Sequence, residues 1–177
     1  MQNYDEKYFN AKANRRAGTT WLALMLIVTV YYGVKASSGD INKDWFVVFT
    51  TIGWIQYFAA GISLKTKGMD FAGYKWIMGI GYLLYFAFIA WTTLDEVSYI
   101  FILPLISILI LYKNPKLIRV MMWLTIFVLI TSNLYKGRVK GMMEFVSSID
   151  CALQFAIVLC CYACTNMAIK HLVASDG

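Results

Sequence analysis

The sequence predicts an all-α membrane protein, a six-transmembrane-helix bundle with both termini cytoplasmic. Three observations lead to this prediction. Apolar residues make up 60% of the 177-residue chain and charged residues only 15%, whereas soluble domains are nearer half apolar and a quarter charged. The apolar residues are gathered into six runs. The basic residues are concentrated in the short segments that join these runs and flank them.

Six apolar runs define the predicted helices, which are 19–34, 45–64, 75–93, 97–112, 117–135 and 149–172. A helix needs about 20 apolar residues to cross a bilayer, so six crossings take up roughly 120 positions. We therefore divide the chain into a cytoplasmic juxtamembrane tail (1–18), a six-helix transmembrane domain (19–172) and a C-terminal tail (173–177). The length left over is too short for a water-soluble catalytic domain.

The fourth run, 97–112, is among the shortest and contains Pro104. Proline lacks an N–H donor and its ring clashes with the preceding turn, so we expect a kink at this position. The carbonyl that loses its donor is expected to bond to a neighbouring helix or to Ser107.

The basic residues predict the orientation. Eleven Lys and Arg side chains lie on the side of the N-terminus, in alternate connections and at both chain ends, and five lie on the other side. By the positive-inside rule both termini are cytoplasmic, and we expect a multi-pass protein of the cell membrane. Attraction of basic residues to anionic lipid accounts for the net charge of +6, so the charge predicts a lipid bilayer as partner and no nucleic acid.

The interior of the six runs excludes several classes of membrane protein. No Lys, Arg, Asp or Glu lies in the middle third of any run. This argues against a proton-coupled pump, a channel lined by charged rings and a voltage sensor. Gly-x-Ser-x-Gly and His-Glu-x-x-His motifs are absent and His171 is the single histidine, so we expect no enzyme, no metal site and no cofactor.

Polar and aromatic residues gather at the outer ends of the predicted helices. They predict an outward-facing cup for a small polar or cationic ligand. The alternative is that short outer turns are polar anyway and that Trp and Tyr favour membrane interfaces. The candidate ligand-binding residues are Trp91, Asp95, Glu96, Tyr99, Asn133, Glu144, Asp150 and Gln154.

Two of these candidates have structural interpretations as well. The spacing Ser147-Ser148-Ile149-Asp150 is that of a capping box, with Ser147 as the cap and Asp150 in the first turn. An amide at the depth of Gln154, like Gln56 in the second run, more often bonds to another helix than to a ligand. The loop 136–146 has the composition of either an interfacial amphipathic segment or a lid over the cup.

Four cysteines lie in the last run, at positions 151, 160, 161 and 164. A zinc site would need a second pair of ligands, and a redox pair would need the N-terminal end of a helix to lower the thiol pKa. We therefore interpret the cysteines as small packing residues. Palmitoylation and a weak metal site are the alternatives.

Several apolar motifs resemble a known kind of membrane region. They are Asn14–Trp21, Met78–Tyr82, Phe86–Thr93, Tyr99–Pro104 and Leu111–Pro115. Together they are similar to the six-helix N-terminal membrane region of some clostridial methyl-accepting chemotaxis proteins and of related sensor proteins with diguanylate-cyclase outputs. In such proteins this region precedes a long cytoplasmic signalling helix.

The resemblance implies a sensory, ligand-binding membrane domain that signals through its last helix. Residues 171–175 would then be the output junction, and a homodimer would be expected. One alternative is the small-molecule-binding component of an uptake transporter, like the substrate subunits of energy-coupling-factor transporters. Those carry an Ala-x-x-x-Ala docking patch on their first helix, and Ala13 and Ala17 have this spacing here. A second alternative is a structural or assembly protein that binds no ligand.

Overall fold

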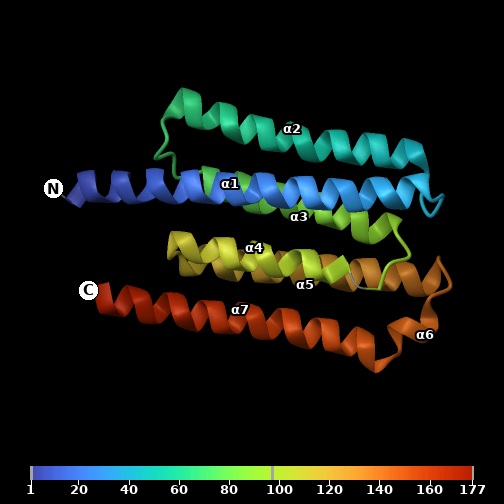
Figure 1. Cartoon of the computed structure of the whole chain (residues 1–177). Helices are drawn as coiled ribbons and strands as arrows, with labels where there is room; N and C mark the ends of the chain where they lie inside the picture. Colours follow the sequence, from blue (N-terminus) through green and yellow to red (C-terminus); the bar gives the residue numbers. More distant parts are fainter. Residues whose placement is uncertain (1, 97, 177) are drawn as a thin grey trace.

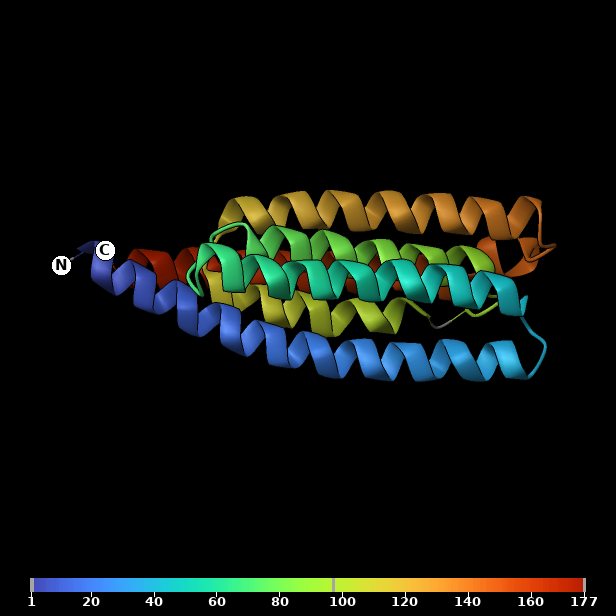
Figure 2. The same ribbon diagram turned by 90° about the horizontal axis from the view of Figure 1, so that it is seen from above.

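The computed structural model describes residues 2–96 and 98–176, and within these ranges it is helical with no strand. The helices run side by side along one axis, and the start of α1 and the end of α7 lie at the same end of the bundle (Figures 1 and 2). The helices are α1 (Gln2–Ser37), α2 (Lys43–Lys67), α3 (Tyr74–Thr92), α4 (Ile102–Leu109), α5 (Pro115–Arg138), α6 (Met143–Val146) and α7 (Ile149–Asp176).

Five of these helices, α1, α2, α3, α5 and α7, are long and apolar enough to cross a membrane. The chain is therefore an all-α, multi-pass membrane protein. Helix α1 is longer than its apolar run and continues through the segment that we assigned to a juxtamembrane tail. It does so because Ala13, Asn14 and Ala17 are buried against the rest of the bundle, which extends the packed face of the helix toward its N-terminus.

The fourth predicted span differs from the other five. Position 97 lies outside the described residues, and the rest of the span, Ser98–Tyr112, is helical, with α4 between the 3-10 turns Ser98–Phe101 and Ile110–Tyr112. The 3-10 turns rise more per residue than an α-helix, so these 15 residues extend over about 26 Å. A short segment thus reaches along most of the bundle.

Pro104 lies in the first turn of α4. In place of the expected kink, the helix changes from 3-10 to α-helical geometry two residues before the proline. The missing N–H of proline costs little in the first turn of a helix. Ser107 does not serve the carbonyl four residues before Pro104, as the sequence suggested it could. Its hydroxyl donates to the Leu103 carbonyl at 3.3 Å instead.

Side-chain caps define several helix ends. The Asn42 side chain accepts from the Asp44 N–H at the start of α2, and Asn114 accepts from Lys116 and Leu117 at the start of α5. At α7 the cap is one residue later than expected. The Ser148 hydroxyl accepts from the Cys151 N–H at 3.4 Å, whereas the Ser147 hydroxyl donates back to carbonyls of α6.

Helices α3 and α4 form the centre of the bundle. Helix α3 packs against α1, α2, α4 and α5, while α4 packs against α1, α3, α5 and α7. The outermost helices in Figure 1 are α2 and α7. On α7 this position leaves Cys160 and Cys164 exposed, and only Cys151 is buried. Cys160 and Cys164 are therefore not packing residues within this chain, contrary to our interpretation of the sequence.

Hydroxyl groups join α3 to its neighbours α1 and α2. The Tyr85 hydroxyl shares hydrogen bonds with Thr29 of α1 at 3.0 Å and with Thr50 of α2 at 3.2 Å. The Trp54 indole also donates to Thr29, at 3.0 Å. Gly53 makes room for the Tyr85 ring, because a Cβ at this position would lie 2.8 Å from a ring atom.

We expect Gly53→Ala to lower the free energy of unfolding by about 1–3 kcal/mol, because the added methyl group would displace the buried Tyr85 ring and its hydrogen bonds. Thermal unfolding in detergent, followed by circular dichroism, measures the change. Gly61→Ala on the same helix is the matched control, since a Cβ there meets nothing within 4 Å. Equal effects of the two substitutions would contradict close packing at Gly53.

Candidate ligand-binding site

Two of the sequence-predicted residues form a buried amide pair at the outer end of the bundle, the end opposite to the chain termini. The Asn133 Nδ2 atom of α5 donates to Gln154 Oε1 of α7 at 3.1 Å, and also to the Leu129 carbonyl at 2.8 Å. Both side chains are about 95% buried. The pair therefore joins α5 to α7, which is the structural role that the sequence suggested for Gln154.

A second buried polar contact lies close to this pair. Lys136, near the end of α5, is 3% exposed, and its ammonium donates to the Asp95 backbone carbonyl at 2.6 Å. The negative charges of Asp95 and Glu96 also attract it. This contact anchors the connection between α3 and α4 to the end of α5. Sequence analysis placed Lys136 in a loop and did not count it as part of a site.

The other candidates are dispersed. Trp91, in the last turn of α3, lines a cleft on another side of that helix. Tyr99 lies in a 3-10 turn and packs against the core. Glu144 of α6 and Asp150 in the first turn of α7 are exposed. The eight residues therefore do not converge on one cup.

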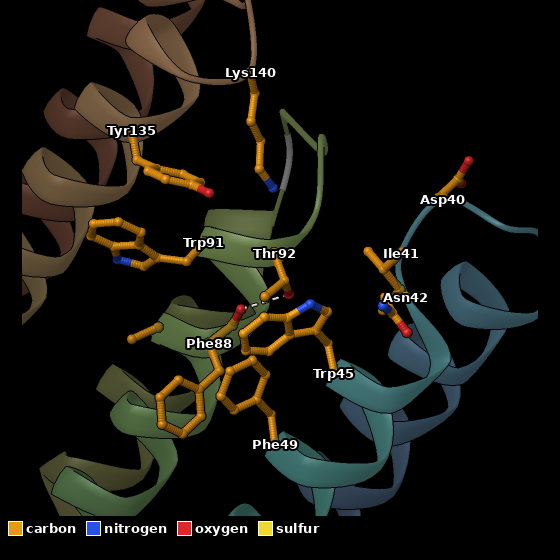
Figure 3. Close-up of a pocket in the computed structure, with 11 residues that line it drawn as sticks. Asp40, Ile41, Asn42, Trp45, Phe49, Phe88, Trp91, Thr92, Tyr135 and Lys140 are labelled. Atoms are coloured by element: carbon orange, nitrogen blue, oxygen red, sulfur yellow. Dashed lines mark hydrogen bonds between the residues drawn. The ribbon is translucent and has the colours of Figure 1, made fainter.

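An aromatic-lined cleft of about 580 Å³, which we call the outer cleft, offers a site for a ligand (Figure 3). It lies at the outer end, between α2, α3 and the end of α5, and the α1–α2 connection borders it. Its aromatic lining consists of Trp45 and Phe49 from α2, Phe88 and Trp91 from α3, and Tyr135 from α5.

The aromatic rings of the outer cleft contact each other in two groups. Phe49 is stacked on Trp45 with ring centroids 5.1 Å apart and on Phe88 with centroids 4.2 Å apart. On the other side, the Trp91 and Tyr135 rings are 4.7 Å apart. Paired rings hold each other in place, so the cleft presents preformed flat apolar surfaces that suit an aromatic or otherwise planar ligand.

Two charged residues border the outer cleft, and their surroundings differ. Asp40 forms an ion pair with Lys35 at 3.7 Å, and its carboxylate points away from the aromatic side chains (Figure 3). Lys140 extends from its loop toward them, with its ammonium 5.5 Å from the centre of the Tyr135 ring. Burial lowers the pKa of Lys140 from the ordinary lysine value. The charge directed toward the cleft is therefore positive.

Of the eight candidate ligand-binding residues, Trp91 alone lines this cleft. A stronger signal was present in the spacing of the aromatic residues. Trp45 and Phe49 are four residues apart, and Phe88 and Trp91 are three residues apart. Residues three or four apart share a face of a helix, so these two groups each mark an aromatic face at the outer end.

Comparison with protein-family models, with curated proteins and with solved structures found no match. The chemistry of the site must therefore be argued from the site itself. Among the described residues, no three His, Cys, Asp or Glu side chains are arranged to hold a metal ion. The features that bear on a possible function are the outer cleft, the ammonium of Lys140 and the buried contacts of α5.

The amide pair provides a test of the contact between α5 and α7. We expect Asn133→Leu and Gln154→Leu each to lower the free energy of unfolding by about 1–2 kcal/mol, because each leaves a buried amide without its partner. The double variant should recover most of this loss, since it removes both polar groups. Unfolding at increasing concentrations of a denaturing detergent measures the free energy of unfolding of all three variants. Strictly additive losses of this free energy would contradict a direct contact.

Proposed function

We propose that this chain is the membrane-embedded, ligand-binding sensory domain of a bacterial signalling receptor, which binds its ligand in the outer cleft and transmits the signal through α7. The observation that carries the proposal is the preformed aromatic cleft at the end of the bundle opposite to the chain termini. The resemblance to six-helix sensor regions of chemotaxis and diguanylate-cyclase-type proteins supports the same function.

The lining of the outer cleft favours a ligand with an aromatic or planar apolar body and an anionic group. Trp45, Trp91 and Tyr135 offer apolar faces, and Lys140 offers a positive charge in partly buried surroundings. The negative charge of Asp40 is already offset by Lys35. We therefore propose an anionic ligand in place of the small polar or cationic one that the sequence suggested.

A route for the signal runs from the outer cleft through α5 to α7. Tyr135 lines the cleft, and the neighbouring positions Asn133 and Lys136 make the buried contacts to Gln154 and to the Asp95 carbonyl. Nearer the inner end, Thr125 of α5 shares a 2.7 Å hydrogen bond with Tyr162 of α7. A ligand that moves the end of α5 would shift α7 through these contacts.

The orientation belongs to the same proposal. We propose six crossings, with the short Ser98–Tyr112 segment as the fourth, and both termini in the cytoplasm. The common end of α1 and α7 and the excess of basic residues on that side support this topology. The cleft would then face outward, and α7 would lead to a partner or output module inside the cell, with pairing of two copies through their signalling helices.

An uptake component would also use an outward-facing cleft. However, the Ala13 and Ala17 pair that could serve as a docking patch is buried on the inward face of α1, with exposed fractions of 4% and 0%. A partner in a transport complex could not reach it. The structure of α1 thus favours the sensory function over uptake.

Lys140→Gln should weaken binding of aromatic carboxylates by about tenfold or more, since it removes a charge-assisted contact. Tryptophan fluorescence and thermal-shift measurements on a panel of aromatic carboxylates and the matched aromatic amines test this. Lys43→Gln is the control, because Lys43 begins α2 at the same end and does not line the cleft. Preferential binding of the amines, unaffected by Lys140→Gln, would overturn the anionic assignment.

Binding should also weaken as the pH rises, because Lys140 loses its proton below the pH at which an ordinary lysine does. In the Lys140→Arg variant the guanidinium stays charged, so its affinity should remain constant to a higher pH than that of the unmodified protein. Titrations of a bound carboxylate across the alkaline range compare the two. Identical pH profiles would show that Lys140 does not contact the ligand.

Signal transmission requires movement of α7 when a ligand binds. We expect the distance between spin labels at positions 12 and 170 to change when a cleft ligand is added to a variant whose four native cysteines are replaced. Double electron–electron resonance measures this distance. The Asn133→Leu/Gln154→Leu variant should bind the ligand with little or no distance change. Tight binding with no movement of α7 in the parent variant would favour uptake over signalling.

A further inference from the structure

We propose that the groove between α1 and α4 binds one phospholipid with an anionic headgroup, whose phosphate contacts Arg15 and Arg16 and whose acyl chain lies along α4. This site is separate from the outer cleft and does not depend on the function proposed above. Two adjoining hollows form it. One is apolar, about 590 Å³ in volume, and the other, of about 580 Å³, is bordered by the two arginines.

The apolar hollow follows from the sequence of α4. Leu103, Pro104 and Ile108 form its floor, and the small side chains of Ser107 and Thr20 leave it open. The Ser107 hydroxyl is satisfied by the Leu103 carbonyl and the Thr20 hydroxyl by the Arg16 carbonyl. The side-chain hydroxyls of this hollow therefore need no water, and a hydrocarbon chain can cover them without leaving their hydrogen bonds unmade.

The second hollow continues the groove toward the inner end. Thr20 and Leu111 line both hollows, so they are contiguous, and Arg15, Arg16 and Thr19 complete the second one. Positive charge thus stands at one end of an apolar groove only. This is the arrangement of a phospholipid, which has one charged end and a long apolar body.

The depth of the arginines matches that of a headgroup. The Tyr112 hydroxyl at the end of the fourth segment donates to Asn14 Oδ1 at 2.9 Å, and Asn14 Nδ2 donates to the Met69 and Phe71 carbonyls between α2 and α3. These contacts place Arg15 and Arg16 level with the inner ends of the apolar segments. Headgroup phosphates lie at this level of a bilayer, and the groove extends from it toward the bilayer centre.

The two arginines are available for such a contact. Among the described residues, no carboxylate forms an ion pair with either of them, and the ion pair between Lys35 and Asp40 lies at the outer end. Guanidinium groups bind phosphate oxygens through paired, directional hydrogen bonds. A zwitterionic lipid would bring its own positive charge to this position, so an anionic headgroup such as phosphatidylglycerol is the better match.

Native mass spectrometry of the full-length chain tests the proposal, with phosphatidylglycerol and phosphatidylcholine of identical acyl chains as probes. We expect one phosphatidylglycerol to be retained in preference. The Arg15→Gln/Arg16→Gln variant should bind it about 30-fold more weakly, since each basic residue near anionic lipid contributes about a fivefold factor. Lys116→Gln/Arg119→Gln, which removes two exposed charges at the same end outside the groove, should have little effect.

Photo-cross-linking locates the acyl chain and needs no change at the arginines. A benzophenone side chain at position 107 should capture phosphatidylglycerol in preference to phosphatidylcholine, whereas one at the exposed Trp123 position of α5 should capture both equally. Equal capture at both positions, or equal losses in the two charge variants, would reduce the groove to general lipid contact and overturn the proposal. Displacement of the lipid by inorganic phosphate would assign the arginines to a free anion instead.

Discussion

The structure depends on a single constraint, which is that polar groups between membrane-spanning helices must find partners inside the protein, since hydrocarbon offers none. The contacts that meet this constraint differ from one level of the bundle to the next. Asn14 of α1 makes three side-chain hydrogen bonds at the inner end, Tyr85 bonds to α1 and α2 in the interior, and Asn133 pairs with Gln154 at the outer end. These contacts fix the helices relative to one another, which apolar packing alone does less specifically in a membrane.

The helical architecture could be predicted because length and apolar character decide it. Each of the six apolar runs coincides with a helical segment, and the caps at Asn42 and Asn114 follow ordinary rules. The exact ends of the helices were harder to predict. Ser147 and Ser148 are equally good caps by residue type, and only the geometry of the preceding turn selects Ser148. The 3-10 turns of the fourth segment were not predicted either, because composition does not distinguish a 3-10 turn from an α-helical one.

The site was predicted less well because it depends on which face of each helix meets which neighbour. Asp95, Asn133 and Gln154 were identified as polar groups at the outer end, and they do lie there, but they join helices and do not line the cleft. The outer cleft uses aromatic residues, which in a membrane protein are expected at interfaces in any case. Lys140 shows most clearly why the sequence alone could not define the site. Only the path of the loop after α5 turns this residue toward the cleft rather than toward water.

The length of α1 has a mechanical consequence. Its 36 residues extend over about 54 Å, nearly twice the thickness of the hydrocarbon layer. Because the helix is continuous, its base inside the bilayer and its projecting arm are mechanically connected. A small tilt of the base, whether set by an occupant of the membrane region or by bilayer thickness, becomes a larger sideways displacement at the tip.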